Sequence, residues 1–101
     1  MVYKQSRQLN SVNDKSENFL KKLQRVINEL DDEINANRNG KGNTGNISQL
    51  ENIRKELESM RNNLSFRRFK PSYTRIIVDS WDYTNSLGTK LLDLYDDYLK
   101  L

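Results

Sequence analysis

The chain has 101 residues, of which 35% are hydrophobic and 31% charged, and its formal net charge is +3. A chain of this length holds one modest core, so we expect residues 1–101 to form a single helical domain. It contains no cysteine and no histidine, which excludes disulfides, thiolate and imidazole catalysis, and nearly all zinc or transition-metal sites.

Neither a signal-peptide-like stretch nor a run of the roughly 20 apolar residues that a membrane span needs is present. We therefore expect a soluble protein, and the lack of cysteine favours the reducing cytoplasm. Charge is unevenly distributed. Residues 1–70 hold 14 basic and 9 acidic residues, a net charge of +5, whereas residues 71–101 hold 3 basic and 5 acidic residues, a net charge of −2.

The first predicted element is an amphipathic helix over about residues 12–37, because apolar residues recur there at alternating spacings of three and four. The apolar stripe consists of Leu9, Val12, Phe19, Leu23, Val26, Leu30 and Ile34, with Ser16 in its one polar slot. Leu20 and Ile27 widen the stripe, which favours packing against two neighbouring helices. Asn13 or Asp14 could cap the start, although the pattern alone could begin the helix nearer Leu9.

The segment at 38–46 is expected to be a loop. It contains three of the four glycines and no apolar residue, so we expect no packed side chain in it. The pair Asn39-Gly40 could also mark a β-hairpin turn, but its flanks have helical and not strand periodicity.

A second helix is predicted over about residues 48–64. Ser48-Gln49-Leu50-Glu51 fits a capping box, in which a serine hydroxyl and a glutamate carboxylate satisfy free N–H groups at a helix start. One face is apolar, formed by Ile47, Leu50, Ile53, Leu57, Met60 and Leu64. Because the loop is short, we expect the first two helices to run antiparallel as a hairpin.

A connector follows at 65–71, where Pro71 disfavours helical geometry in the residue before it. Its Phe66–Lys70 segment interleaves two phenylalanines with Arg67, Arg68 and Lys70. These cations form a candidate basic patch for nucleic acid or acidic lipid headgroups. We favour the alternative that both rings close the end of the bundle while the cations stay in water.

The third helix is predicted over about 72–100, with Ser72 as a candidate cap and a possible break near 84–88, where helix formers are weak. A continuous helix of that length would span roughly 40 Å, which exceeds what a compact domain with a radius of gyration near 13 Å covers. Either the helix breaks or a second chain covers the overhang. Residues 73–83 would also suit a strand, which could pair only with a second copy.

The candidate protein-contact patch lies in this last segment. Asp79 and Asp82 are three residues apart and share a helix face, and Tyr83 points away from the inward stripe that holds Trp81. The pair of carboxylates could bind a cation, but a solvated face is the more common role of such residues. We therefore propose Asp79, Asp82 and Tyr83 as contacts for another protein, and Trp81 as a core residue.

These elements predict an all-α fold: an antiparallel helical hairpin plus a long or broken C-terminal helix, in a three- to four-helix bundle. No nucleotide-binding glycine loop or catalytic motif occurs, so we expect no enzyme activity, cofactor or metal. The leading hypothesis is a non-catalytic protein-binding module, such as an inhibitor, an immunity or antitoxin-like protein, or a regulatory adaptor of bacterial or phage type. The alternatives are a nucleic-acid-associated regulator that uses Phe66–Lys70, and a structural subunit of a homodimer or larger homo-oligomer.

In size and helical layout the predicted bundle resembles bacteriocin-immunity proteins, and the resemblance is one of architecture without a shared motif.

Overall fold

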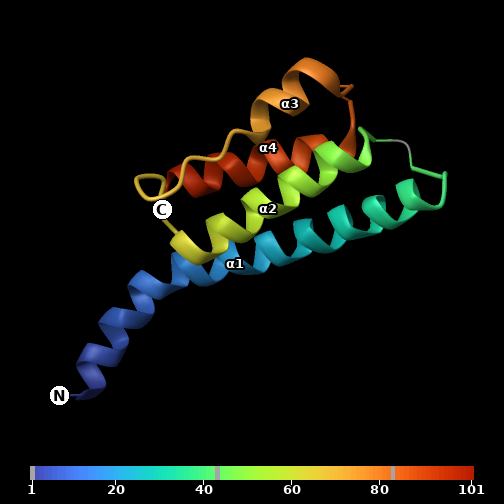
Figure 1. Ribbon diagram of the computed structural model, residues 1–101. Coiled ribbons are helices and arrows are strands. Elements are labelled where there is room, and N and C mark those ends of the chain that lie inside the picture. Colours follow the sequence, from blue (N-terminus) through green and yellow to red (C-terminus); the bar gives the residue numbers. More distant parts are fainter. Residues whose placement is uncertain (1, 43, 83) are drawn as a thin grey trace.

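The computed structural model describes residues 2–42, 44–82 and 84–101, with side chains from Lys15 onward. Within these residues the chain forms four α-helices and no strand (Figure 1). The helices are α1 (Val2–Arg38), α2 (Ile47–Asn63), α3 (Tyr73–Ser80) and α4 (Ser86–Leu99). The predicted all-α bundle is therefore confirmed, and residues 73–80, which would also have suited a strand, are helical.

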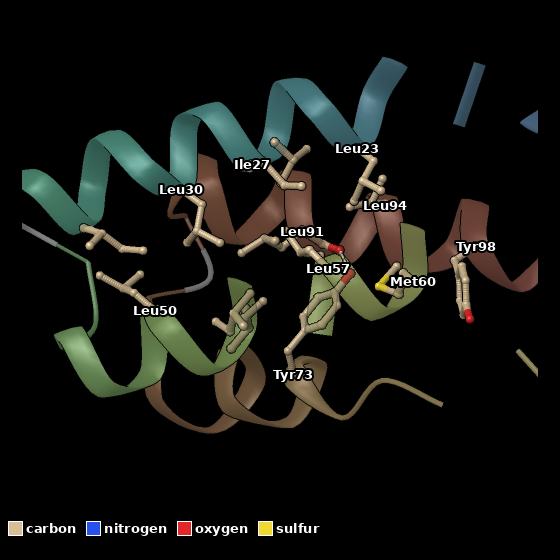
Figure 2. Packing of buried hydrophobic residues seen from close by; sticks show 14 of the residues in the cluster. Leu23, Ile27, Leu30, Leu50, Leu57, Met60, Tyr73, Leu91, Leu94 and Tyr98 are labelled. Carbon is tan, nitrogen blue, oxygen red and sulfur yellow. Dashed lines mark hydrogen bonds between the residues drawn. The ribbon is translucent and has the colours of Figure 1, made fainter. Parts of the chain in front are cut away.

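The core lies between α1, α2 and α4. Helices α1 and α2 run antiparallel, α4 also packs against α1, and α3 rests on α2 and α4 (Figure 1). The widened stripe of α1 thus meets two neighbours, as its width predicted. Apolar residues from all four helices fill the interior (Figure 2). The residues with no exposed surface include Leu23, Leu30, Leu50, Ile53, Leu57, Met60, Tyr73, Leu91, Leu94 and Tyr98.

Helix α1 begins ten residues before the predicted start at about residue 12 and has 37 residues. At 1.5 Å per residue it is about 55 Å long, close to the 57 Å length of the whole molecule. Its N-terminal part extends past the other helices (Figure 1). The radius of gyration is accordingly 15.6 Å, larger than the value near 13 Å expected for a compact chain of this length.

The loop between α1 and α2 is more tightly held than its composition suggested. Thr44 is buried, its backbone N donates to Glu33 Oε2 at 3.1 Å, and its hydroxyl accepts from Asn85 Nδ2 at 2.8 Å. The expectation that no side chain packs here is wrong, because hydrogen bonds from distant helices satisfy the buried polar atoms of Thr44. Gly45 has a φ of +59°, and a Cβ on it would lie 2.8 Å from Trp81 Nε1.

Helix α2 starts at Ile47, one residue before the predicted start, and its cap differs from the predicted capping box. Asn46 is the N-cap, and its side-chain oxygen accepts from Gln49 N at 2.9 Å. Glu51 instead accepts from Arg38 Nη2 at 2.8 Å. The prediction was wrong because Asn46 lies three residues before a free N–H group, that of Gln49, and so caps the helix two residues earlier than Ser48 would.

The C-terminal segment is broken at residues 81–85, starting earlier than the predicted 84–88. Trp81 is extended, with φ −100° and ψ 154°, and its ring is buried in the core as expected. Asn85 then caps α4 by accepting from Gly88 N at 2.8 Å. The break turns α4 back along α1, so the C-terminal segment does not form the continuous helix of roughly 40 Å that the sequence left open.

Helix α3 is capped by a residue from α2. Ser72 stands at the N-cap position, as predicted, but its hydroxyl makes no capping bond and donates to Glu56 Oε2 at 2.8 Å. The backbone N–H groups of Ser72 and Tyr73 donate to Glu56 Oε1 at 2.9 and 2.8 Å. One carboxylate therefore satisfies two of the backbone donors at this helix start and links α3 to α2.

Candidate functional site

A groove lies between α3 and α4, beside the predicted acidic patch. Its volume is about 140 Å³, and its lining residues are Ile77, Val78, Trp81, Asp82, Gly88, Thr89 and Leu92. Ile77 and Trp81 belong to the core, so the inner wall is apolar. We call this feature the α3–α4 groove.

Gly88 sets the depth of the α3–α4 groove. It is buried, and a Cβ on it would lie 3.2 Å from Ile77 Cγ2 and 3.3 Å from Trp81 Cε3. A larger residue would therefore push α3 away from α4 or fill the floor of the groove.

The rim of the α3–α4 groove combines an apolar and an acidic residue. Val78 has 70% of its surface exposed, against 45% for Leu99 on α4. Asp82 is exposed, and it accepts from Thr84 N at 3.0 Å and from Thr84 Oγ1 at 2.9 Å. These two hydrogen bonds, of which the one from the Thr84 backbone has the larger effect, hold the pKa of Asp82 below its ordinary value of 3.8. Asp82 is therefore anionic at neutral pH while also closing the turn after α3.

The other two residues of the predicted contact patch have different positions. Asp79 is exposed on α3, next to Val78 in the chain, but it does not line the groove. Tyr83 lies outside the described residues. Among the three candidates, Asp82 is the one that the structure places in the groove.

The connector closes one end of the bundle with its aromatic residues. Phe66 and Phe69 are half-buried and pack on the core. The Phe66 ring centroid lies 6.3 Å from that of Tyr95 and 6.4 Å from that of Tyr98, both edge-on. The Tyr98 hydroxyl donates to Ser65 O at 2.7 Å and Phe69 O at 2.9 Å. The prediction that both rings close the bundle is confirmed.

The cations of the connector remain at the surface. Arg67, Arg68 and Lys70 are exposed, and Lys70 Nζ lies 5.7 Å from the centroid of the Phe66 ring. Because both rings are half-buried against the core, this segment presents exposed charge with only part of each ring accessible.

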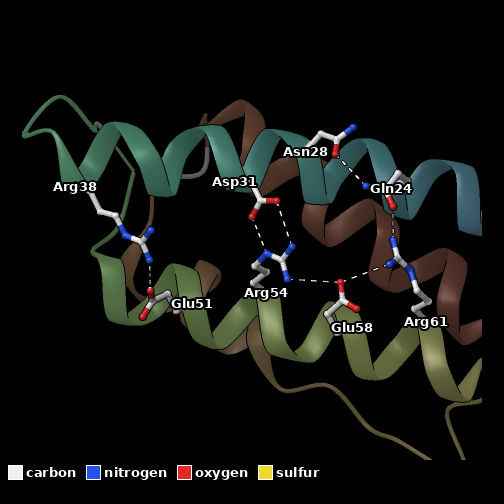
Figure 3. A network of polar contacts seen from close by, with 8 residues as sticks. All are labelled: Gln24, Asn28, Asp31, Arg38, Glu51, Arg54, Glu58 and Arg61. Carbon is white, nitrogen blue, oxygen red and sulfur yellow. Dashed lines mark hydrogen bonds and ion pairs between the residues drawn. The ribbon is translucent and has the colours of Figure 1, made fainter.

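Many other charged side chains form ion pairs or hydrogen bonds between helices. Arg54 donates to Asp31 through Nε at 2.6 Å and through Nη2 at 3.3 Å, and it lies 3.6 Å from Glu58 (Figure 3). Arg61 bonds to Gln24 across the same interface (Figure 3). The α1–α4 interface carries the pairs Lys90–Glu29, Lys22–Asp93 and Lys22–Asp97. Asp79 and Asp82, by contrast, make no ion pair with any residue whose side chain is described.

In the described part of the chain, acidic residues form no group of three or more that could hold a metal ion. The α3–α4 groove is also smaller than the roughly 300–1,000 Å³ of pockets that enclose cofactors. It matches the size of a single side chain better than that of a nucleotide or flavin.

Sequence reasoning found Asp82 and Trp81 in this region but missed its outer apolar residues, Val78 and Leu92. Val78 follows two apolar residues, and its exposure depends on where α3 rests on α4. Leu92 falls one position outside the inward stripe of α4, next to Leu91. The one available signal was a surplus of apolar residues over what a single helix stripe can bury.

Comparison with known proteins yields no match: no family model fits the chain, and no curated protein or solved structure is significantly similar to it. No helix in the described residues is long and apolar enough to cross a membrane.

Proposed function

We propose that this chain is a non-catalytic protein-binding module, of the inhibitor, immunity or regulatory adaptor kind, and that the α3–α4 groove is its docking surface. The observation that carries the proposal is Val78, an aliphatic side chain 70% exposed at the rim of an apolar groove. Leaving such a residue in water forgoes roughly 1–2 kcal/mol of hydrophobic stabilisation that a partner could recover.

The occupant that fits is a segment of another protein with an apolar side chain flanked by lysine or arginine. A volume of about 140 Å³ accommodates one aliphatic side chain. Asp82 on the rim and Asp79, next to Val78 in the chain, supply the charge complementarity, because both are exposed and residues 71–101 carry a net charge of −2. Charged rims mainly set association rate and specificity, while the buried apolar anchor supplies affinity.

The first experiment is selection of linear peptides from a displayed random library on the purified protein. We expect the selected peptides to share an apolar residue within a few positions of lysine or arginine. Selection of acidic peptides, or of peptides with no shared apolar position, would contradict the proposed occupant.

Three variants then test the site with a selected peptide by calorimetry. Val78→Gln, and separately Asp79→Asn with Asp82→Asn, should each weaken binding about tenfold, close to 1.4 kcal/mol. Asparagine keeps an oxygen for Thr84, so the turn is preserved. Leu99→Gln removes a comparable exposed aliphatic residue elsewhere and should leave binding unchanged. Equal affinity for the wild type and Val78→Gln would overturn the proposal.

The homodimer hypothesis makes a second copy the occupant of the same groove. In that case light scattering would show a dimer, and the Val78→Gln variant would be a monomer. The groove would then be occupied by the second copy and could not bind another protein. The segment of the second copy that combines apolar and basic residues is Phe66–Lys70. Its two phenylalanine rings, however, are packed on the core of their own chain.

The exposed Arg67, Arg68 and Lys70 support the nucleic-acid hypothesis. The packing of Phe66 and Phe69 on the core weakens it, because these rings would have to stack on bases. A gel shift with single-stranded oligonucleotides at two salt concentrations tests it, since binding through phosphates weakens steeply as salt rises.

A further inference from the structure

A second, larger pocket lies where α1 leaves the bundle beside the end of α4. Its volume is about 300 Å³, and Lys15, Phe19, Lys22, Asp97 and Lys100 are among its lining residues. It is separate from the α3–α4 groove, because the two have no lining residue in common. We call it the α1–α4 pocket.

The inner wall of the α1–α4 pocket is apolar. Phe19 is a core residue with only 4% of its surface exposed, and its ring centroid lies 5.7 Å from that of Tyr98. This ring contact anchors the wall to α4, so the pocket is set by packed aromatic residues. The aliphatic stems of the lysines extend the apolar surface toward the mouth.

The cations around the pocket fall into two kinds. Lys22 Nζ is held by Asp97 at 2.5 Å and Asp93 at 3.1 Å, so these three side chains together carry a net charge of −1. Lys15 and Lys100 are exposed and form no ion pair with any acidic residue whose side chain the structure describes. Lys15 and Lys100 thus line one apolar cavity as two ammonium groups that no described carboxylate pairs with.

From this arrangement we propose that the α1–α4 pocket binds a small amphipathic anion, with its apolar body against Phe19 and its carboxylate between Lys15 and Lys100. An apolar solute alone would leave the ammonium groups unpaired, and a small inorganic anion would leave the apolar wall wet. At roughly 30 Å³ for each water-sized group, the pocket holds about ten such groups, which corresponds to a medium-chain carboxylate. This inference does not depend on the proposed function.

The test is to titrate the full chain with octanoate and to measure binding by calorimetry and by changes in the amide chemical shifts. We expect saturable binding, with shifts concentrated in residues 15–22 and 96–101. Lys15→Gln with Lys100→Gln should weaken octanoate binding at least tenfold. The matched control is Lys41→Gln with Lys55→Gln, which removes two exposed lysines elsewhere and should have no effect.

Two further probes separate the contribution of the apolar wall from that of the lysines: octanol lacks the charge, and acetate lacks the apolar chain. Octanol and acetate should each bind at least tenfold more weakly than octanoate. Octanol binding as tightly as octanoate would reduce the site to an apolar patch, and acetate binding as tightly would reduce it to surface charge. Either result overturns the proposal.

A third outcome assigns the lysines to a polyanion instead. The connector with Arg67, Arg68 and Lys70 lies at the same end of α4, because Phe66 and Phe19 both contact the Tyr98 ring. If a single-stranded oligonucleotide bound with steep salt dependence and lost affinity in Lys15→Gln with Lys100→Gln, while octanoate caused no shifts, the amphiphile site would be refuted.

Discussion

At the scale of single residues, Tyr73 shows how one buried polar atom is accommodated. Its side chain is fully buried, and its hydroxyl donates to Leu91 O at 2.7 Å (Figure 2). This bond links the start of α3 to the middle of α4. Burial first, and then the nearby charge of Glu56, raise the pKa of Tyr73 well above its ordinary value of 10.0.

We predict that Tyr73→Phe lowers stability at pH 7 by about 1 kcal/mol, the usual net value of one hydrogen bond. The raised pKa also gives a pH dependence. Above pH 10 the unfolded tyrosine releases its proton while the folded one retains it, so stability falls with rising pH by up to about 1.4 kcal/mol per unit. Below pH 10 this contribution is fully present.

Tyr73→Phe should therefore lose stability less steeply than the wild type between about pH 10 and 11.5. Urea unfolding followed by circular dichroism at several pH values measures both slopes. Parallel slopes for the two proteins would show that Tyr73 ionises equally easily in the folded and unfolded chains.

At the scale of elements, the ends of the short helices depend on side chains that come from elsewhere in the chain. Glu56 of α2 binds the N–H groups of Ser72 and Tyr73 at the start of α3. Asn85 caps α4 and also donates to Thr44 in the distant loop. An eight-residue helix is marginal by itself, so these contacts are a large part of what holds α3 in place.

We predict that Glu56→Ala lowers the free energy of unfolding by about 1–2 kcal/mol, because it leaves the N–H groups of Ser72 and Tyr73 without their acceptor. Glu56→Gln keeps one acceptor oxygen and should cost less than half as much. Urea denaturation measures both variants, with exposed Lys55→Ala as the control on the same helix. Equal losses for the alanine and glutamine variants would mean that the charge, and not the acceptor geometry, matters.

At the scale of the whole molecule, the length of α1 separates a packed body from an extension. Among the residues whose side chains are described, the buried part of α1 begins at Phe19, while the helix itself begins at Val2. The break at residues 81–85 has the opposite effect, since it folds the C-terminal segment back on the bundle. The molecule is consequently compact in two dimensions and long in the third, at 57 × 24 × 22 Å.

We predict that deleting residues 1–14 leaves the urea midpoint of unfolding unchanged within error, because the buried residues whose side chains the structure describes begin at Phe19. The positive control is Phe19→Ala in the full chain, which should cost about 3–5 kcal/mol because it empties a core position. A midpoint lowered by the deletion would show that residues 1–14 contribute to the stability of the body.

Much of the fold could be predicted from local pattern. The three-four spacing of Leu23, Leu30, Leu57 and Leu94 predicted helices and their inward faces, because helical period and burial both act on every turn. The width of the α1 stripe predicted two neighbours. Weak helix formers near Asn85 predicted a new cap, and Asn85 is the N-cap of α4.

The sequence by itself determined the all-α class, the hairpin and the core, since each depends on periodic apolar residues that any helix would align. Only the tertiary structure decided which polar side chain caps which helix, where Trp81 ends α3, and why Val78 stays in water. It also brought Lys15 and Lys100, 85 positions apart in the chain, to one pocket. These features depend on the particular contacts between helices, and residue spacing within one helix does not specify which side chains of the other helices it meets.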